Sequence, residues 1–600
     1  MKLLRRAINY IKANGIKKSF WRLFCKIRDK FNSGKKEKIE QENYLKWIND
    51  NEPSISELEE QRKHKFEYNP KISIIVPMYN TKERYFSELV DSVKSQTYSN
   101  FELCLADGSA KTQDFIKEYI SDDDRIKYKL LEKNDGISGN SNEGLKMATG
   151  DFIALLDHDD ILPAFSLFEV VKAINENKDV EFLYSDEDKL IEYKDKRMGP
   201  HFKSDFAIDT LRSYNYICHL SVFKKELIDK IGGFRKEYDG SQDYDIIFRA
   251  TSNAKKIVHI PKILYHWRIN EASVASSASA KPYAYIAAKK AIKKNLSDFH
   301  QEGEVLDSKI LGLYRVKYFA NNNKKVSIII PNKDHVRDLK KCIRSILKST
   351  YDNYEIIIVE NNSIKKSTFK YYEKIKNKYN NLKIVVHNQE TFNYSNLNNV
   401  GVKNSSGDIL LFLNNDIEII SKDFLETIVG DVSRDDIGIV GAKLLYRDNT
   451  IQHAGIVLNF TGVAGHVNAH LKSYDVGYMG RTMIQQNFNA VTGAMLAIKR
   501  TTFDEIDGFD ENFPVAYNDI DICLKVRSRG LLVMYDPYIE AYHYESKTRG
   551  YEDTKEKKDR LIKDTSKIKE KWPEIFNRPD EYFNINFRND VPDMRVKIKE

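Results

Sequence analysis

Short β-branched apolar runs alternate with amphipathic helical segments along most of the chain. Residues 71–77 (KISIIVP) form one such run, and residues 84–96 then carry apolar side chains at helical spacing. A second apolar run, residues 101–107 (FELCLAD), ends in an acid. Apolar strands that alternate with amphipathic helices are typical of βαβ units, in which helices cover both faces of a mostly parallel sheet. The pattern therefore predicts an α/β fold.

This pattern occurs twice in the chain. The run KISIIVP at residues 71–77 recurs as KVSIIIP at 325–331, and GDFIALLDHD at 150–159 recurs as GDILLFLNND at 407–416. Motifs that repeat in the same order at nearly constant spacing indicate tandem domains. We predict a helical arm and connector (1–66), a first domain (67–300), a linker with a second domain (301–560) and a charged C-terminal tail (561–600).

Basic residues are concentrated at the beginning of the chain. Residues 1–40 contain thirteen Lys and Arg against three acids, whereas the whole chain of 600 residues has a net charge of only +8. Apolar residues such as Leu4, Ile8 and Ile11 recur at helical spacing between these cations. A basic amphipathic helix can lie on an anionic membrane surface, and it can equally dock on the protein's own body. The sequence leaves both interpretations open.

Composition argues against several classes of protein. No apolar run approaches the 18 residues of a membrane-spanning helix, and five dispersed cysteines without a CxxC pair indicate neither a disulfide framework nor a zinc module. The beginning of the chain lacks the continuous apolar stretch of a secretory signal. Beyond residue 40 the chain is nearly neutral, which argues against a nucleic-acid partner. We expect a cytoplasmic protein, peripheral on the inner face of the cytoplasmic membrane.

Acidic residues stand directly after apolar runs in both repeats. Asp157 and Asp159 follow the run FIALL in the first repeat, and Asp416 has the corresponding place in the second. Ligands of open α/β sheets bind outside the carboxyl ends of the strands. Two carboxylates at such an end can bind Mg²⁺ or Mn²⁺, which prefer oxygen ligands, and the cation can bridge a nucleoside diphosphate. Taken alone, the motif favours a solvated acidic loop, and only its context favours a cation site.

Five elements in order resemble the motifs of a known family. They are VPMYN at 76–80, ADG at 106–108, the glycine-containing run at 139–151, DHD at 157–159 and the acid Asp243 in SQDYD. Together they resemble the inverting glycosyltransferases of family 2, which have the GT-A fold. The resemblance covers roughly residues 70–300 and 322–560. It implies two tandem GT-A domains, which are Rossmann-like with a mostly parallel sheet.

The resemblance also implies roles for particular residues. It implies nucleotide-sugar binding by Pro77, Tyr79, Asn80, Asp107 and Asp157 in the first domain and by Pro331, Asn332, Glu360 and Asn414 in the second. It implies metal binding by Asp157, Asp159 and His266 in the first domain and by Asp416 and His543 in the second. It implies Asp243 and Asp519 as the catalytic bases. The sequence leaves open that these two acids cap helices and that the two histidines are packed core residues.

The second repeat departs from the first at its metal motif. Asn414 stands where the first repeat has Asp157, which removes one anionic ligand. The form NND is similar to that of rhamnosyltransferases of the family, and QHAG at 452–455 looks like an acceptor-side element of the same group. We expect an active second site with a different donor. A degenerate second domain that only binds the acceptor is the alternative.

The expected function is that of a bifunctional, metal-dependent inverting glycosyltransferase. It would transfer sugars from nucleotide-diphosphate donors to a growing, lipid-linked bacterial surface polysaccharide such as a capsule, O-antigen or cell-wall glycan. Inverting transfer needs one carboxylate that removes the proton of the attacking hydroxyl and a cation that stabilises the leaving diphosphate. A sugar nucleotidyltransferase is less favoured, because PMYNT at 77–81 and PNKD at 331–334 lack the glycines that cradle a triphosphate.

Overall fold

The structure of the chain is a computed structural model that describes residues 38–191, 196–269, 282–544 and 554–599. The basic arm predicted over residues 1–31 lies outside the described residues. The described part begins with a helix over residues 38–51, followed by α3 (Ile55–Lys63), so helices occupy the predicted connector. No helix in the described ranges is long and apolar enough to cross a membrane.

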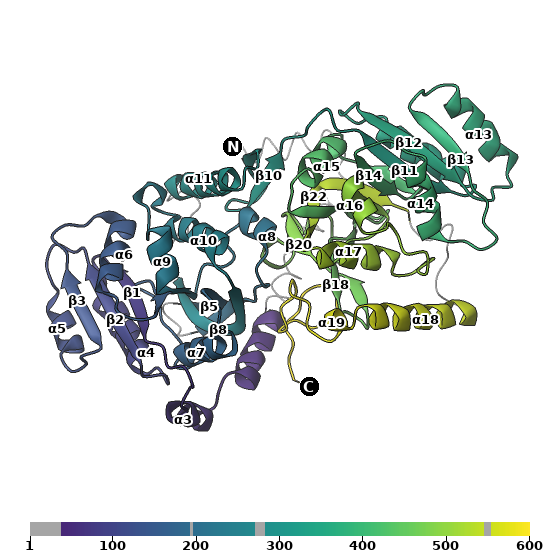
Figure 1. Cartoon of the computed structure of the whole chain (residues 1–600). Helices are drawn as coiled ribbons and strands as arrows, with labels where there is room; N and C mark the ends of the chain where they lie inside the picture. Colours follow the sequence, from purple (N-terminus) through teal and green to yellow (C-terminus); the bar gives the residue numbers. More distant parts are fainter. Residues whose placement is uncertain (1–37, 192–195, 270–281, 545–553, 600) are drawn as a thin grey trace, which may run out of the picture.

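The first domain is an α/β unit built on an eight-stranded sheet (Figure 1). Its strands are β1 (Ile72–Met78), β2 (Phe101–Asp107), β3 (Ile126–Leu130), β4 (Phe152–Leu155), β5 (Phe182–Ile191), β6 (Lys196–His201), β7 (Ser221–Lys224) and β8 (Ile257–Ile269). Its helices are α4 (Glu83–Lys94), α5 (Asp114–Ile120), α6 (Gly136–Met147), α7 (Ser166–Glu176), α8 (Ile208–Ser213), α9 (Lys225–Ile231), α10 (Gln242–Asn253) and α11 (Pro282–Asp298). The strand predicted at 101–107 and the helix predicted at 84–96 are confirmed in β2 and α4.

Successive side chains of β1 point into hydrophobic cores on opposite faces of the first sheet. Ile74 and Val76 point into one core, where α4 contributes Phe86 and Val90, whereas Ile75 points into the core on the other face. Successive side chains of a strand point to opposite faces, so a continuous apolar run suits a strand covered on both sides. Burying each of these side chains contributes roughly 1.5–3 kcal/mol.

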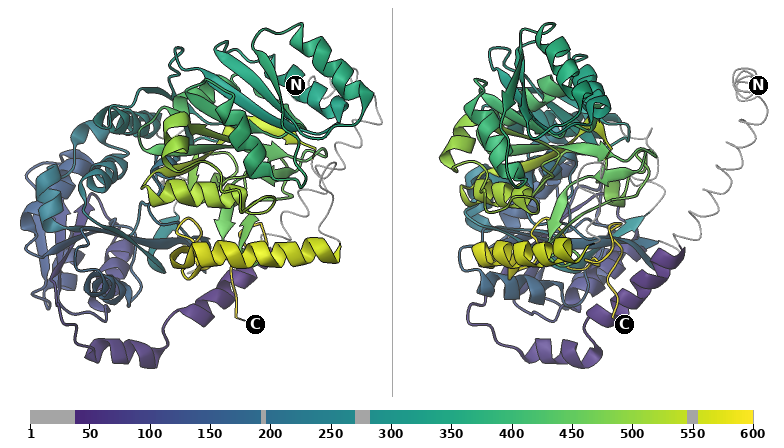
Figure 2. Two further views of the ribbon diagram at one scale, coloured as in Figure 1. Left: turned by 45° about the vertical axis from the view of Figure 1, so that its right-hand side comes forward. Right: turned by 90° about the vertical axis from the view of Figure 1, so that its right-hand side faces the viewer.

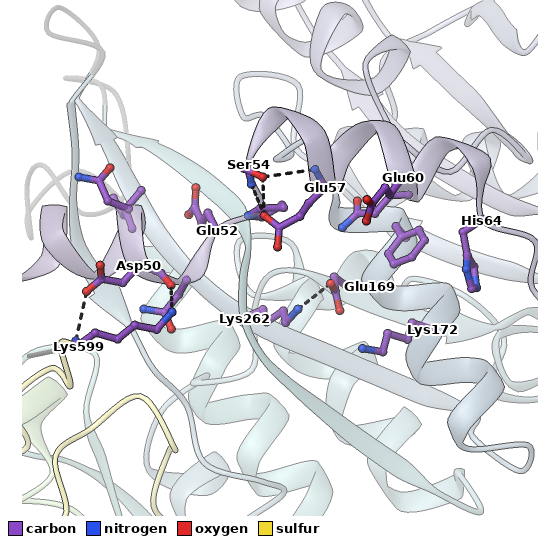
Figure 3. Close-up of a pocket in the computed structure, with 16 residues that line it drawn as sticks. Asp50, Glu52, Ser54, Glu57, Glu60, His64, Glu169, Lys172, Lys262 and Lys599 are labelled. Atoms are coloured by element: carbon purple, nitrogen blue, oxygen red, sulfur yellow. Dashed lines mark hydrogen bonds and ion pairs between the residues drawn. The ribbon is translucent and has the colours of Figure 1, made fainter.

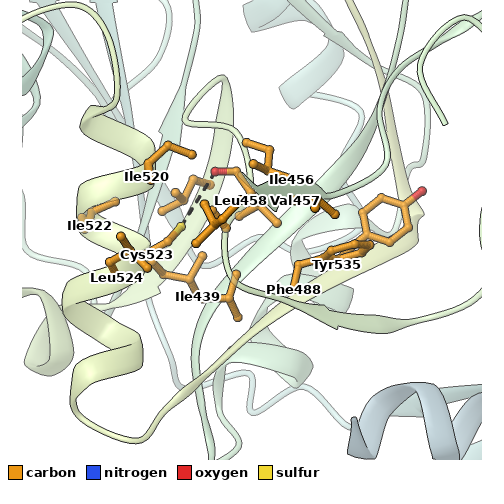
Figure 4. Close-up of a cluster of buried hydrophobic side chains, with 14 of the residues drawn as sticks. Ile439, Ile456, Val457, Leu458, Phe488, Ile520, Ile522, Cys523, Leu524 and Tyr535 are labelled. Atoms are coloured by element: carbon orange, nitrogen blue, oxygen red, sulfur yellow. Dashed lines mark hydrogen bonds between the residues drawn. The ribbon is translucent and has the colours of Figure 1, made fainter. Parts of the chain in front are cut away.

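The second domain repeats this architecture with a ten-stranded sheet. Its strands are β11 (Val326–Asn332), β12 (Tyr354–Glu360), β13 (Leu382–Val386), β14 (Ile409–Leu413), β15 (Ile417–Ile419), β16 (Ile437–Leu445), β17 (Ile451–His453), β20 (Gln486–Phe488), β21 (Met495–Lys499) and β22 (Leu532–His543); β18 (Ile456–Leu458) and β19 (Ala464–His466) form a separate pair. Its helices are α12 (Val336–Ile346), α13 (Lys366–Lys376), α14 (Tyr394–Lys403), α15 (Phe424–Val432), α16 (Arg500–Glu505), α17 (Asn518–Ser528), α18 (Lys555–Lys571) and α19 (Pro573–Phe576). Figure 4 shows part of its largest core, in which α17 packs on the sheet.

The two sheets have the same strand order. The first runs β3-β2-β1-β4-β7-β5 and the second β13-β12-β11-β14-β21-β16. In each, the first four strands are parallel, and the fifth pairs antiparallel with the fourth. This topological match agrees with the internal repeat and confirms two tandem α/β domains.

The segment between the domains is an antiparallel hairpin. After α11, β9 (Gly303–Asp307) and β10 (Tyr314–Tyr318) pair antiparallel, and β10 lies between the domains (Figure 1). Beside it, Arg434 Nη1 of the second domain lies 2.5 Å from the Asp209 carboxylate on α8. The backbone N–H of Asp209 also donates to the Asn487 side chain. The interface is therefore buried and polar.

The C-terminal segment returns to the first domain. Asn584 Nδ2 donates to Asp186 Oδ2 at 2.9 Å and to the carbonyl of Lys203 at 2.8 Å. Phe587 packs edge-on against Phe202 at a ring distance of 5.7 Å. Figure 2 shows α18 lying along the second domain, with the chain end beside the helix over residues 38–51. The predicted charged tail thus contains a packed segment that joins the two domains.

Candidate active sites

A cavity of about 1140 Å³ lies at the carboxyl ends of the first sheet's central strands. Pro77 and Asn80 line it at the end of β1, Asp157 and Asp159 line it after β4, and Asp243 lines it at the start of α10. Because β1 and β4 are parallel neighbours, their carboxyl ends meet at one edge of the sheet. Five residues that the family resemblance implies therefore share one pocket.

Three side chains in this region could together hold a cation. Asp157, Asp160 and His219 each offer a ligand atom within 4.8 Å of the others. His219 Nε2 lies 3.8 Å from Asp157 Oδ2, and its Nδ1 lies 3.1 Å from Glu187 Oε2. A carboxylate partner on the far nitrogen is the usual way to orient a metal-binding imidazole. Two carboxylates and an imidazole fit Mg²⁺ or Mn²⁺.

The electrostatic environment of Asp157, Asp160 and His219 favours positive charge. Burial alone would raise the pKa of Asp157, but its hydrogen bond and attraction to His219 outweigh burial and lower it. Burial, with repulsion from Asp159 and Asp157, raises the pKa of Asp160 well above its usual value. Burial lowers the pKa of His219, yet neighbours that include Cys218 and Asp157 more than compensate and raise it well above its usual value. The raised pKa values of Asp160 and His219 reflect an excess of neighbouring acids, which attracts a proton or, in competition with it, a metal cation.

Asp243 lies in the first turn of α10, and its carboxylate is held by a neighbouring loop. Asn215 Nδ2 donates to Asp243 Oδ2 at 2.8 Å, and Cys218 Sγ lies 3.5 Å from the same oxygen. The residue before α10 is Ser241, which makes no side-chain cap. Burial raises the pKa of Asp243, and His219 partly offsets that rise. A carboxyl group whose pKa is raised toward neutrality is suited to accept a proton in catalysis.

Two implied nucleotide-binding residues of the first domain differ in their surroundings. Asp107 is buried at the end of β2, where it accepts hydrogen bonds from the Ser109 N–H and the Tyr128 hydroxyl, both at 2.9 Å. Tyr79 is 51% exposed. Neither belongs to the described lining of the cavity, and Asp107 acts on the neighbouring loop through the Ser109 backbone.

His266 lies on β8, and its side chain points away from the cavity. Its Nδ1 lies 2.5 Å from Asp188 Oδ1. Its neighbour Trp267 lines the cavity, and the hydroxyl of Tyr265 donates to Asp160 Oδ2 at 2.6 Å. Because side chains alternate along a strand, His266 is directed to the opposite side from these two residues. The structure does not bring it together with the carboxylates at the cavity.

Strand pairing explains this placement. In the second domain Ile417, one residue after the NND motif, pairs with His543. In the first domain Ile161, two residues after the DHD motif, pairs with His266. The place that corresponds to His543 is therefore taken by Trp267. A slip of one residue in register reverses the face to which a side chain points.

In the second domain the implied metal ligands lie together. His543 Nε2 is 3.3 Å from Asp416 Oδ1 and 3.4 Å from Asn414 Nδ2. His543 Nδ1 is 2.8 Å from Gln452 Oε1, which accepts its proton. This bond leaves Nε2 as the nitrogen directed at Asp416. Asp416 and His543 could hold a divalent cation, with one anionic ligand fewer than the first domain offers.

The remaining implied residues of the second domain line the ends of β11 and β12. Glu360 accepts hydrogen bonds from the Ser363 N–H at 2.6 Å and from the Tyr372 hydroxyl. Asn332 donates to Tyr372, and its Oδ1 accepts from Asn415 Nδ2 at 2.6 Å. Pro331 precedes Asn332 in β11. These contacts join the β11 end to the NND motif.

Asp519 has a position analogous to that of Asp243. It lies in the first turn of α17, and its Oδ2 accepts from the Gly493 N–H at 3.1 Å. A side-chain amide holds Asp243, whereas a backbone amide holds Asp519. In both domains the N–H donor comes from the loop that precedes the strand antiparallel to the DHD or NND strand.

Comparison with known proteins gives two matches within the chain. The sequence profile described as Glycosyl transferase family 2 matches residues 73–232 and again residues 327–507, together more than half of the chain. The chain belongs to glycosyl transferase family 2. The two matched ranges contain the DHD and NND motifs at corresponding places, so both domains are family members.

Two curated relatives of this family 2 glycosyltransferase align with most of its length. It is 39% identical over 532 residues to the uncharacterized protein y4gI of Sinorhizobium fredii, and 32% identical over 512 residues to the O-antigen biosynthesis protein RfbC of Myxococcus xanthus. These alignments cover 87% and 84% of the chain, but only 58% and 40% of the two relatives. A Campylobacter jejuni protein, GalNAc(5)-diNAcBac-PP-undecaprenol beta-1,3-glucosyltransferase, is 30% identical over 29% of the chain and 57% of its own length.

Solved structures similar to this glycosyltransferase are more distant. TarS of S. aureus, residues 1–349, has a TM-score of 0.31 and 21% identity over 38% of the chain and 65% of its own. Mannosyltransferase PcManGT from Pyrobaculum calidifontis, in complex with GDP-Man and Mn²⁺, has a TM-score of 0.31 and 13% identity over 49% and 75%.

Several functional candidates of this glycosyltransferase carry little or no sequence signal. Asp160 directly follows the DHD motif, so its position next to the motif could be read from the sequence. Its place among the candidate metal ligands could not. His219 and Asn215 lie in the loop before β7, whose sequence does not resemble that of the corresponding loop before β21, which supplies Gly493. Gln452 belongs to the QHAG motif, which predicted an acceptor-side element rather than a partner of His543. Long-range contacts of this kind follow only from the folded arrangement.

A second hollow, of about 980 Å³, shares no lining residue with the first cavity; Figure 3 shows the residues that line it. It is bounded by the helix over residues 38–51, α3, α7 and β8. Its walls mix both signs of charge: Glu169 lies 2.6 Å from Lys262, and Lys599 contacts the backbone of Asp50. None of the residues implied by the family motifs lines it.

Proposed function

We propose that each domain is an inverting glycosyltransferase that uses a nucleoside-diphosphate sugar and a divalent cation, and that the two act on one growing glycan. The observation that carries this proposal is the duplicated arrangement of an acid held by an N–H donor, Asp243 by Asn215 and Asp519 by Gly493, next to the DHD or NND motif. Each arrangement supplies one base, which is what a single displacement at the anomeric carbon requires.

The chain's own residues perform definite tasks in this mechanism. Pro77 and Asn80 line the donor side of the first cavity, and Asp157 and Asp159 lie at the strand end where a diphosphate would sit. Asp243 removes the proton of the attacking hydroxyl, and its orientation is fixed because Asn215 occupies Oδ2. A divalent cation, when bound at Asp157, Asp160 and His219, would neutralise charge on the leaving diphosphate.

The second domain is proposed to be active, with another donor. Its candidate cation site has one anionic ligand fewer than that of the first domain. The hydrogen bond to Gln452 fixes the tautomer of His543, however, so that Nε2 faces Asp416. A degenerate second domain, which would only bind the acceptor, remains the competing proposal. The two differ in whether Asp519 is needed for transfer.

The acceptor is proposed to be a lipid-linked bacterial surface glycan. The name of the Myxococcus relative refers to O-antigen biosynthesis, and that of the Campylobacter relative to an undecaprenol-linked acceptor. The basic amphipathic pattern of residues 1–31 suits the anionic membrane surface where such an acceptor would lie. Deletion of residues 1–31 should lower partitioning into anionic vesicles and leave transfer to a soluble acceptor intact. Unchanged partitioning would refute the peripheral membrane contact.

Base substitutions in each domain test the proposal. Asp243→Asn and Asp519→Asn should each lower their own transfer step by roughly 10²–10⁴-fold, because a general base contributes about that much. The measurement is release of nucleoside diphosphate across a donor panel, together with product mass. Asp229→Asn, an exposed acid at the end of α9, is the matched control. Near wild-type turnover of Asp243→Asn would refute the base assignment, and an unchanged product profile of Asp519→Asn would favour the degenerate second domain.

A further inference from the structure

The cavity of the first domain has two chemically different sides. The strand side carries Asp157, Asp159 and Lys82, which suit a cation and a diphosphate. The other side is formed by the start of α10, by α11 and by the turn and strand of β10. It is rich in aromatic side chains, with Tyr244, Tyr283, Tyr285 and Tyr314 among its lining residues.

The helix side of the cavity is unsuited to an anion. Among the described lining residues, Lys82 is the only Lys or Arg, and it lies on the strand side, next to α4. The charged residues of the helix side are the acids Asp239 and Asp243. A phosphate there would be repelled by Asp239 and Asp243, and the described lining of the helix side has no Lys or Arg to pair with it. An uncharged ligand is not repelled by these acids and needs no cationic partner. If it has hydroxyl groups and an apolar face, it can contact both the aromatic walls and the few polar groups of this side.

Tyr283 packs against the turn that precedes Asp243. Its ring lies against Gly240, whose φ is +94° and where a Cβ would come within 2.5 Å of the ring. The adjoining residue, Ser241, donates through its hydroxyl to the carbonyl of Ala284 at 2.8 Å. These contacts fix the first turn of α11 against the loop three residues before the base. The Tyr283 side chain is nevertheless 52% exposed, so part of its ring surface is open to a ligand.

We propose that this side of the cavity, made by α10, α11 and β10, is the acceptor subsite of the first domain, and that it takes an uncharged pyranose ring on Tyr283. The assignment rests on the proposed transferase function, since it makes the ligand the nucleophile that Asp243 activates. A pyranose ring has an apolar face of C–H groups for the aromatic wall and an edge of hydroxyls for the base.

The proposed subsite depends on the connection between the domains. Gly312 lines the cavity from the turn before β10, and Tyr314, which also lines it, begins the strand that ends at Tyr318. The ring of Tyr318 lies 4.7 Å from the Arg434 guanidinium of the second domain. The wall that receives the acceptor is therefore held by both domains, and a first domain cut after α10 would lack it.

Binding experiments on the full-length protein separate the two sides of the cavity. The donor-side probes are UDP and GDP with Mn²⁺, measured by calorimetry, and the acceptor-side probes are neutral p-nitrophenyl hexopyranosides, measured by saturation-transfer NMR. Tyr283→Ala should weaken glycoside binding about tenfold and leave the nucleotide Kd unchanged. Ile286→Ala, one turn further along α11 and 66% exposed, should change neither. Tyr283→Phe should retain glycoside binding, because the ring is kept.

Each other outcome contradicts a definite part of the argument. Weaker nucleotide binding in Tyr283→Ala with unchanged glycoside binding would overturn the subsite and assign this wall to the donor. Wild-type protein that binds a nucleotide but no glycoside would overturn the sugar assignment. Wild-type protein that binds glycosides but neither nucleotide would refute the proposed transferase function instead. If Tyr283→Ala loses both ligands and has a lowered Tm, Tyr283→Phe decides the question, because it keeps the ring. An equal loss of glycoside binding in Tyr283→Phe would overturn stacking on the ring.

Discussion

His259 is a buried cation whose charge should stabilise the first domain in a pH-dependent way. Its side chain is 2% exposed on β8, and it lies between two carboxylates: Nε2 is 2.8 Å from Asp186 Oδ1 and Nδ1 is 3.1 Å from Asp205 Oδ1. Its ring also stacks on Tyr184 at 4.9 Å. Burial lowers the pKa of His259, but attraction to Asp186 and hydrogen bonds to both acids outweigh it and raise the pKa to about 9.

The size and sign of the effect follow from this pKa. The folded-state pKa of about 9 exceeds the ordinary value of 6.5, so the folded protein holds a proton that the unfolded chain releases between these values. At 1.36 kcal/mol per pKa unit, the charge contributes about 3 kcal/mol to the free energy of unfolding. This contribution is fully present below pH 6.5 and is lost as the pH rises through 9. For a domain of this size it corresponds to roughly 6–12 °C in Tm.

Thermal denaturation of the wild type and His259→Gln across pH 6 to 10 tests this expectation. The Tm difference between the two proteins should be largest near pH 6 and should shrink as the pH approaches 10, because only the wild type loses a proton. A direct NMR titration of the His259 ring should give a midpoint near 9. A constant Tm difference over the whole range, or a midpoint near 6.5, would refute the proposed buried ion pairs.

Two further predictions concern residues that position the candidate active sites. Asn215→Ala should lower kcat of the first transfer roughly 10-fold to 100-fold with little change in donor KM, because it removes a hydrogen bond to a charged group; a rise in donor KM alone would contradict the link to Asp243. Gln452→Leu should weaken Mn²⁺ binding at the second site about 10-fold to 100-fold, because the orientation of His543 is lost. That affinity is measured by electron paramagnetic resonance with the first site disabled by Asp157→Ala, and Gln452→Glu, which keeps the acceptor, should retain it.

Much of the fold could be predicted from local pattern. The apolar run at 71–77 and its copy at 325–331 became β1 and β11 at the centres of their sheets, because only a strand buried on both faces needs such a run. The acids after β4 could be placed at a strand end for the same reason. What the sequence could not supply was pairing register, and a difference of one residue separates the environment of His266 from that of His543.

The contacts between distant segments were also beyond prediction. The pattern of residues 561–600 indicated only a charged tail, yet Asn584 is buried against Asp186. The contact depends on a partner 398 positions away, and no local spacing encodes it. His219 was missed for the same reason, because its significance arises only where its loop meets the DHD motif.

The return of residues 580–587 to the first domain has a consequence for biosynthesis. Asn584 contacts Lys203 across 381 positions of chain, and a ribosome needs roughly 20 to 75 s to make that length. During this interval the first domain has emerged, but Phe202 and Asp186 lack the segment that covers them. The nascent protein must therefore pass through a stage in which the apolar side chain of Phe202 lacks its C-terminal cover and can associate with other chains. Expression yield should depend on elongation rate as well as on the stability of the finished fold.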